Sequence, residues 1–228
     1  MHSVNPVICA LDTQDLDKAI FLANALRDKV GMVKLGLEFF AAHGLFGIRE
    51  VAKCNIPIFL DVKLHDIPNT VARTVAVIKD LNVAMLTLHI TGGAKMLTEA
   101  LNIVQGTTIK LIGVTVITSM NDDDLIECGI DRGVKSQVNL LAKLAKKSGL
   151  HGVVCSALEA QEIRQECGDS FDIVTPGIRM NSSYNDQKRI ATPKEAITLG
   201  ADYIVIGRPI TESADPAKTA ELILSSLD

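Results

Sequence analysis

Eight short apolar runs alternate along the chain with amphipathic segments, and this alternation constrains the fold more than any other feature of the sequence. The runs have the length and the β-branched content of buried strands, and they cover residues 6–11, 32–36, 57–62, 84–90, 110–118, 152–157, 172–177 and 203–207. The segments with helical spacing are 15–30, 68–81, 93–104, 134–147, 157–166, 193–199 and 215–227. Alternating strands and helices predict a parallel sheet with right-handed crossovers.

Eight such units in 228 residues predict an α/β fold with a single closed (β/α)8 barrel, a TIM barrel. We expect residues 1–228 to form one domain, because no low-complexity linker or break in composition divides the chain. An open, doubly wound sheet is the alternative. Such a sheet normally carries a glycine-rich turn after its first strand, whereas the turn here reads LDTQD.

The composition narrows the class of protein. The net charge is −4, with no lysine- and arginine-rich run and no Trp, so we expect no nucleic-acid surface. The five cysteines contain no C-x-x-C pair, which argues against a disulfide framework or a zinc site. The first residues, MHSVNPVICALD, lack a signal-peptide pattern, and no run of 18 apolar residues occurs. We therefore expect a cytoplasmic protein that does not enter a membrane.

Polar residues stand at the end of every expected strand. Barrels of this kind place their functional sites at the C-terminal ends of the strands, on the loops that lead into the helices. In chain order these polar residues are Asp12, Lys34, Asp61 with Lys63, His89, Thr118 with Ser119, Ser156, Arg179 and Arg208. This distribution predicts a ligand site across the mouth of the barrel.

The third expected strand, 57–62, runs directly into charged residues. Asp61 and Lys63 are two positions apart, so on an extended strand their side chains point to the same side. Asp66 follows in the next loop, and Lys34 lies near the end of the neighbouring strand. A buried ion pair that only closes the barrel is the alternative, but it leaves the third charge unexplained. Two acids and two bases of alternating sign predict a charged site in the barrel mouth.

A second polar group is expected after the seventh and eighth strands. The segment 175–189 has Arg179 near its start and Gln187 near its end, and the run IGRPI contains Gly207 and Arg208. Phosphate sites in these barrels commonly use these two loops. Two guanidinium groups and an amide suit a phosphate dianion, and a glycine lets a ligand approach the backbone. A solvated loop with surface arginines is the alternative.

Other polar clusters indicate structure rather than chemistry. Residues 122–124 are three aspartates in the first turn of an expected helix, where capping and the helix dipole explain them better than a metal does. His43, His65 and His151 have no metal-ligand spacing. We therefore expect no metal site.

Taken together, these residues form a pattern that resembles the bacterial branch of the orotidine 5′-phosphate decarboxylase family. The motif D-x-K-x-x-D from Asp61 to Asp66 continues as IPNT. It is joined, in the family's order and over nearly the whole chain, by the segments ALD, VKLGLE, VTVITSM, TPGIR, DQKR and IGRPI.

The resemblance implies a lyase of pyrimidine biosynthesis that needs no cofactor and no metal. It would convert orotidine 5′-phosphate to uridine 5′-phosphate and carbon dioxide, and it would work as a homodimer. Lys63 would donate a proton to C6 of the pyrimidine. Asp61 and Lys34 would complete a charged array with Asp66, which the partner subunit would contribute together with its neighbouring loop.

The resemblance also implies the remaining substrate contacts. They are Asp12 at the ribose hydroxyls, Thr118 near the pyrimidine with Ser119 beside it, Ile67 and Thr70 in the loop next to Asp66, and Arg179, Gln187, Gly207 and Arg208 at the phosphate.

Three other functions would use some of the same residues. A magnesium-dependent decarboxylase or aldolase acting on a sugar phosphate can share D-x-K-x-x-D, but the Lys34 ammonium would repel the cation. A Schiff-base aldolase would need Lys63 as a neutral nucleophile, whereas the acids beside it favour an ion pair. A non-catalytic module that binds a nucleotide phosphate would have no use for Lys63 between two acids.

Overall fold

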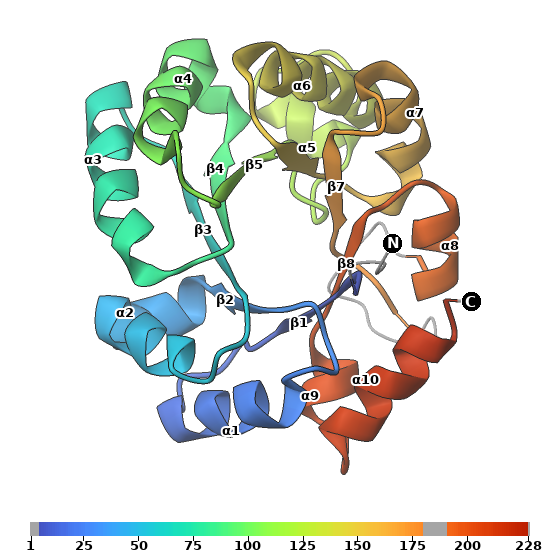
Figure 1. Ribbon diagram of the computed structural model, residues 1–228. Helices are drawn as coiled ribbons and strands as arrows, with labels where there is room; N and C mark the ends of the chain where they lie inside the picture. The colour runs from blue at the N-terminus through green and yellow to red at the C-terminus, as the bar shows by residue number, and fades with distance from the viewer. Residues whose placement is uncertain (1–4, 180–190, 228) are drawn as a thin grey trace.

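The computed structural model describes residues 5–179 and 191–227 of the chain. Its eight strands form a closed parallel barrel in sequential order, and β1 pairs with both β2 and β8 (Figure 1). The strands are β1 Val7–Ala10, β2 Met32–Gly36, β3 Ile58–Leu64, β4 Met85–His89, β5 Lys110–Val114, β6 Gly152–Val154, β7 Asp172–Thr175 and β8 Tyr203–Ile206. The predicted TIM barrel is confirmed, and closure between β1 and β8 excludes the open sheet.

Helices surround the barrel on the outside (Figure 1). They are α1 Leu16–Leu26, α2 Leu37–Ala52, α3 Pro68–Ile78, α4 Gly93–Val104, α5 Asp122–Glu127, α6 Val134–Ser148, α7 Ala157–Cys167, α8 Pro193–Thr198, α9 Arg208–Thr211 and α10 Pro216–Ser225, with 3-10 turns η1 Lys79–Leu81 and η2 Ile90–Gly92. The sequence pattern gave no bounds for α2, α5 or α9. The backbone at Gly44 leaves the helical conformation, with φ of 53°, and breaks the period of α2, while α9 has a single turn. No helix of the described chain is long and apolar enough to cross a membrane.

The strands are buried on both faces, which explains their nearly continuous apolar runs. One cluster fills the barrel interior and includes Ile8, Met32, Phe59, Met85, Ile112, Val174, Tyr203 and Val205. A larger cluster packs the outer faces of the strands against the helices. Phe59 is almost fully buried and lies directly beneath the charged residues of β3. The interior is thus a packed core, with a cavity at the C-terminal ends of the strands.

The structure corrects the predicted positions of two polar residues, Thr118 and Ser156. β5 ends at Val114, so Thr118 lies in the loop beyond the strand rather than at its end. Ser156 is buried and its hydroxyl accepts a hydrogen bond from the Leu158 N–H, while the Glu159 carboxylate accepts one from the Ser156 N–H. These bonds form a capping box at the start of α7, so Ser156 belongs to the helix and not to the ligand site.

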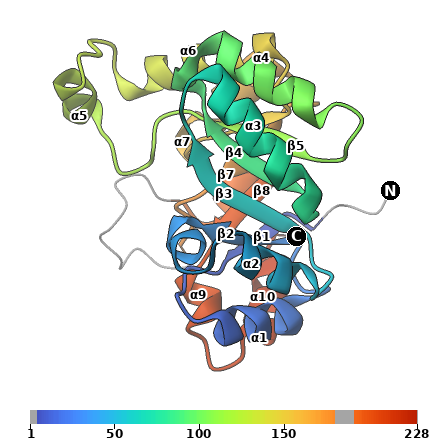
Figure 2. The same ribbon diagram turned by 90° about the vertical axis from the view of Figure 1, so that its left-hand side faces the viewer.

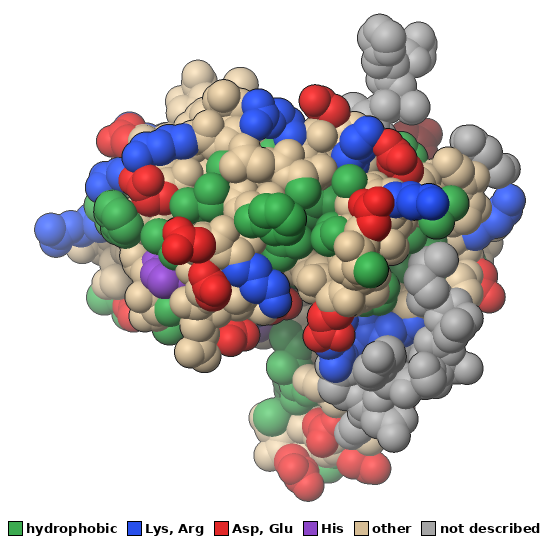
Figure 3. Space-filling model, turned by 90° about the horizontal axis from the view of Figure 1, so that it is seen from below, with side chains coloured by type: hydrophobic (Ala, Val, Ile, Leu, Met, Phe, Trp, Pro, Cys, Tyr) green, Lys and Arg blue, Asp and Glu red, His purple; other side chains and the backbone are tan. Residues whose placement is uncertain are grey.

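The three aspartates at 122–124 begin α5, which projects from the body of the barrel (Figure 2). Asn121 caps the helix by accepting from the Asp124 N–H, and the Asp124 carboxylate accepts from the Asn121 N–H. The capping interpretation of this acidic run is therefore confirmed. Figure 3 shows a projecting lobe with acidic side chains, and it shows charges of both signs interspersed over the rest of that face.

Candidate active site

A cavity of about 280 Å³ lies at the C-terminal ends of the strands. Its lining comprises Ala10, Asp12, Lys34, Phe59, Asp61, Lys63, Val114, Val116, Ile117, Thr118, Val154, Cys155, Val174, Pro176, Gly177, Arg179, Val205, Gly207 and Arg208. Of the residues that the sequence predicted for the site, eight share this cavity: Asp12, Lys34, Asp61, Lys63, Thr118, Arg179, Gly207 and Arg208. The loops and strand ends that carry them are far apart in the sequence, and closure of the barrel brings them together.

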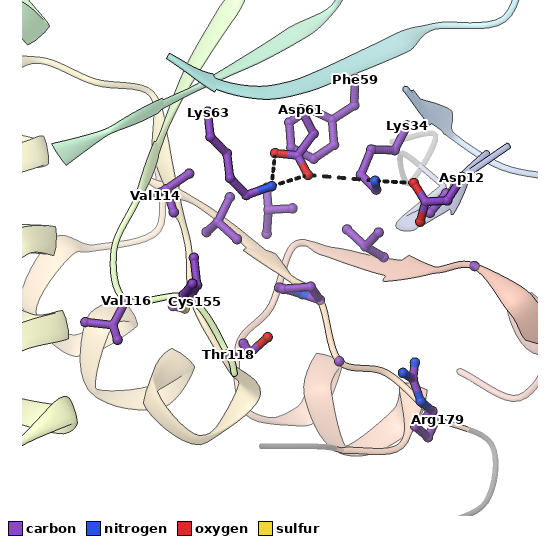
Figure 4. Close-up of a pocket in the computed structure, with 18 of the residues that line it drawn as sticks. Asp12, Lys34, Phe59, Asp61, Lys63, Val114, Val116, Thr118, Cys155 and Arg179 are labelled. Carbon is purple, nitrogen blue, oxygen red and sulfur yellow. Dashed lines mark hydrogen bonds and ion pairs between the residues drawn. The ribbon is translucent and has the colours of Figure 1, made fainter. Parts of the chain in front are cut away.

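Four charged side chains form a row of alternating sign along one side of the cavity (Figure 4). Lys34 Nζ lies 3.0 Å from Asp12 Oδ1 and 3.8 Å from Asp61 Oδ2. Lys63 Nζ lies 2.9 Å from both carboxylate oxygens of Asp61. The two central side chains are largely shielded from solvent, with 11% of Lys34 and 14% of Asp61 exposed. Each charge therefore has an opposite charge beside it, which offsets much of the cost of its burial.

The backbone of β3 is irregular where it enters the site. Between two pairing positions β3 advances from Leu60 to Leu64 while β4 advances only from Leu86 to Leu88. Within this bulge Lys63 adopts a left-handed conformation with φ of 49°. The prediction of an extended strand at Lys63 is therefore wrong, although its side chain still meets the neighbouring carboxylate as expected. The left-handed conformation costs a non-glycine residue about 1 kcal/mol, so surrounding contacts must stabilise it.

Apolar side chains form another wall of the cavity, with Val114, Val116, Val154, Cys155 and Val174 among them. They come from β5, β6 and β7 and the loops that follow these strands. Thr118 adds a hydroxyl at this wall (Figure 4), whereas Ser119 is exposed and does not line the cavity. The pairing of a charged side with an apolar wall suits a flat ring that carries one ionised substituent.

Two arginines mark a second polar region. Arg179 is buried, and Figure 4 shows it apart from the charged row, across the cavity. Its backbone is fixed because the Arg179 N–H donates to the Ala191 carbonyl at 3.0 Å. Arg208 follows Gly207 at the start of α9. A Cβ atom placed on Gly207 would lie 3.5 Å from Ala10, so contacts with the described chain do not require glycine there.

Several predicted residues lie elsewhere. Asp66, Ile67 and Thr70 are exposed and do not line this chain's own cavity. The Asp66 carboxylate accepts a hydrogen bond from the Ile67 N–H at 2.7 Å. Gln187 lies outside the described residues.

Other residues that shape the site were not predicted from the sequence. Phe59, which is almost fully buried, and Cys155 both line the cavity. A Cβ atom on Gly36 would lie 3.0 Å from Lys34 Nζ and 3.1 Å from Asp12 Oδ1, so glycine leaves room for that ion pair. The run VKLGLE contains this glycine, but the space it provides depends on a contact between two strands.

Two groups near the charged row have shifted pKa values. Burial lowers the pKa of His89, and the neighbouring His65 and Lys63 lower it further. The rings of His65 and His89 are in contact, with centroids 5.4 Å apart. Burial also raises the pKa of the Cys9 thiol to about 12, so this cysteine is an inert core residue.

Residues 5–223 match the family described as orotidine 5′-phosphate decarboxylase / HUMPS. The chain is 76% identical over 224 residues to the orotidine 5′-phosphate decarboxylase of Wolbachia pipientis subsp. Culex pipiens (strain wPip), a match covering 98% of this chain and 99% of that relative. It is 58% identical to the enzyme of the same name from Ehrlichia canis (strain Jake), with 98% of each chain covered. The crystal structure of orotidine 5′-phosphate decarboxylase from Lactobacillus acidophilus superimposes with a TM-score of 0.84 at 37% identity, covering 98% of this chain and 99% of the other.

Proposed function

The chain belongs to the orotidine 5′-phosphate decarboxylase / HUMPS family, and we propose that it decarboxylates orotidine 5′-phosphate to uridine 5′-phosphate and carbon dioxide in pyrimidine biosynthesis. One observation carries this proposal. The row Asp12–Lys34–Asp61–Lys63 lines the same cavity as Arg179 and Arg208. A phosphorylated substrate that loses a carboxylate needs a group to bind its phosphate and fixed charges at the reacting carbon.

The reaction requires electrostatic stabilisation of a carbanion. Loss of carbon dioxide from C6 of the pyrimidine leaves a carbanion in the plane of the ring, where no ring carbonyl can delocalise it. We assign to the Lys63 ammonium the stabilisation of this charge and the transfer of a proton to C6. Opposite charges about 4 Å apart interact by about 4 kcal/mol at an effective dielectric constant of 20, against about 1 kcal/mol in water. The shielded position of the row thus increases the contribution of the ammonium.

In this scheme Asp61 orients the Lys63 side chain. Its carboxylate contacts Lys63 Nζ through both oxygens and so aims the ammonium into the cavity. Lys34 lies on the other side of Asp61 and holds Asp12 in turn. The row is therefore pre-organised before substrate binds, and little reorganisation accompanies the appearance of charge at C6.

The other parts of the substrate can each be assigned to a region of the cavity. We place the pyrimidine against the apolar wall near Thr118, and the ribose hydroxyls at Asp12. The phosphate would be bound by Arg179 and Arg208, with Gly207 allowing close approach to the backbone and Gln187 adding an amide. Binding energy from the phosphate can then hold the ring in the position where it reacts.

A magnesium-dependent reaction on a sugar phosphate remains the rival. A divalent cation would seek the carboxylate oxygens of Asp12 and Asp61. Lys34 Nζ already contacts both of these carboxylates, at 3.0 and 3.8 Å, which favours the cation-independent decarboxylation.

The test of the function is a spectrophotometric assay of the purified protein with orotidine 5′-phosphate in the presence of EDTA. We expect the ultraviolet absorbance change of decarboxylation, with the same rate after magnesium is added. If no absorbance change occurs in EDTA, and the protein acts on a sugar phosphate once magnesium is supplied, the decarboxylase assignment would be refuted in favour of the magnesium-dependent function.

Removing the Arg208 guanidinium tests the phosphate assignment. We expect Arg208→Ala to lower kcat/KM by about 100-fold, because the phosphate loses a charged partner while its other contacts remain. Arg49 is a matched control, since it is exposed in the last turn of α2, away from the cavity. Arg49→Ala should keep the wild-type kcat/KM, and unchanged kinetics in Arg208→Ala would refute the phosphate assignment.

We also propose a homodimer in which Asp66 and its loop complete the site of the partner subunit. The support is that Asp66, Ile67 and Thr70 lie outside this chain's own cavity although the motif containing Asp61 and Lys63 leads directly into them.

A further inference from the structure

Thr87 is a buried residue of β4 that contacts two members of the charged row from behind. Its side chain has no exposed surface. Its hydroxyl oxygen lies 2.9 Å from the Lys63 backbone nitrogen and 3.0 Å from Asp61 Oδ1. Among the described residues none from β4 lines the cavity, so Thr87 reaches the site only through these two contacts.

The direction of both hydrogen bonds follows from the groups involved. The Lys63 N–H can only donate, so the Thr87 hydroxyl oxygen accepts from it. The hydroxyl proton is then available for Asp61 Oδ1, which as part of a carboxylate can only accept. One hydroxyl thus joins the backbone of the lysine to the side chain of its neighbouring acid.

The bulge in β3 explains why a side chain is needed at this place. Thr87 is the single residue of β4 between the pairing positions Leu86 and Leu88, and it faces the extra residues of β3. In the bulge the regular ladder is interrupted, and Lys63 takes a left-handed backbone conformation. The Thr87 hydroxyl supplies the Lys63 N–H with an acceptor and so stabilises a conformation that is otherwise unfavourable.

The second bond fixes the carboxylate. Asp61 Oδ1 accepts from both Thr87 Oγ1 and Lys63 Nζ, while Oδ2 faces Lys63 Nζ at 2.9 Å and Lys34 Nζ at 3.8 Å. With Oδ1 held from behind, rotation of the carboxylate away from the two ammonium groups would break a buried hydrogen bond. Leaving a buried polar group without a hydrogen-bond partner is unfavourable, which favours the observed orientation.

We propose that Thr87 is a positioning residue for the decarboxylation. Its hydroxyl holds the Lys63 backbone and the Asp61 carboxylate in the arrangement that aims the ammonium at C6. This inference rests on the proposed function. Thr87 does not contact the cavity, so its removal should affect the rate of the chemical step much more than substrate binding.

The test compares isosteric substitutions at two buried threonines. Thr87→Val preserves shape but removes both hydrogen bonds, and Thr87→Ser keeps the hydroxyl. Thr115 is the matched control, because it is 3% exposed and its hydroxyl donates to the Val154 carbonyl at 2.7 Å, away from the charged row. Thr115→Val therefore also loses a buried hydrogen bond, without touching the lysine or the acid.

We expect Thr87→Val to lower kcat by about 100-fold, the loss expected when reacting groups are displaced slightly, with KM close to the wild-type value. Thr87→Ser should recover most of the rate, and Thr115→Val should lose stability in urea unfolding but keep the wild-type kcat. If Thr87→Val does not fold, Thr87→Cys replaces it, since a thiol fits the site but forms only weak hydrogen bonds.

A wild-type kcat in Thr87→Val or Thr87→Cys would overturn the positioning role and leave the proposed function intact. The same holds if Thr87→Ser is as slow as Thr87→Val, because the shape of the side chain would then be the cause. If the wild-type protein itself does not decarboxylate orotidine 5′-phosphate, both the function and the role of Thr87 fail.

Discussion

Lys63→Ala is expected to lower kcat for orotidine 5′-phosphate by about 10⁴-fold or more, because the variant loses both the stabilising charge and the proton donor at C6. Lys34 Nζ lies on the far side of Asp61 from Lys63, so it is not placed to substitute for the lost ammonium. Single-turnover and steady-state absorbance assays in EDTA measure the loss.

The fold should survive this substitution. Lys63 is 30% exposed, and Asp61 retains Lys34 and the Thr87 hydroxyl as neighbours in the variant. Circular dichroism and urea unfolding check this point. Lys53→Ala is the matched control, because Lys53 forms a surface ion pair with Glu50 outside the site and should keep the wild-type rate. A Lys63→Ala protein that turns over within about tenfold of the wild type would contradict the assignment of Lys63 as proton donor.

Mixing two inactive variants is expected to restore activity. Lys63→Ala and Asp66→Ala should each be inactive as a homodimer, because each removes one charge of the array. In a hybrid dimer one site receives both substitutions and the other receives the native Lys63 of one chain and the native Asp66 of its partner. Random exchange in an equal mixture makes half of the dimers hybrid, so about a quarter of the wild-type activity is expected.

The exposed position of Asp66 is the reason for this expectation. Its carboxylate bonds to the adjacent Ile67 N–H and does not line the cavity that contains Lys63. Unfolding and refolding the mixed chains permits subunit exchange, and size-exclusion chromatography measures the oligomeric state. The control is refolding each variant alone, which should restore nothing. A dimeric mixture that stays inactive would refute a shared site, and an active monomer would refute the dimer requirement.

Much of the architecture could be predicted from local patterns. Strand β2 and helix α4 have the predicted bounds, and the other predicted elements differ by a few residues at their ends. This success has a physical basis, because an apolar run or a helical period is a property of residues that are neighbours in the sequence. The alternation of strands and helices then allows few chain topologies, because the crossover connections between parallel strands are almost always right-handed.

The predictions that were wrong concern contacts between residues that are distant in the sequence or depend on a bonding partner. The left-handed conformation of Lys63 arises from a mismatch in pairing between β3 and β4, and the pattern of β3 alone gives no sign of it. The role of Ser156 was misjudged because a helix cap and a strand-end ligand have the same residue type. A short sequence pattern does not distinguish such cases, because the partner of the hydroxyl decides between them.

The sequence by itself determined the barrel and the set of charged residues at the ends of its strands, because both follow from local periodicity and from motif spacing. Only the tertiary structure decided which of these residues meet. It placed Lys34 between Asp12 and Asp61, and it placed Thr87 behind the Lys63 bulge. Those contacts join different strands, and their distances depend on register and barrel closure, which are properties of the whole fold.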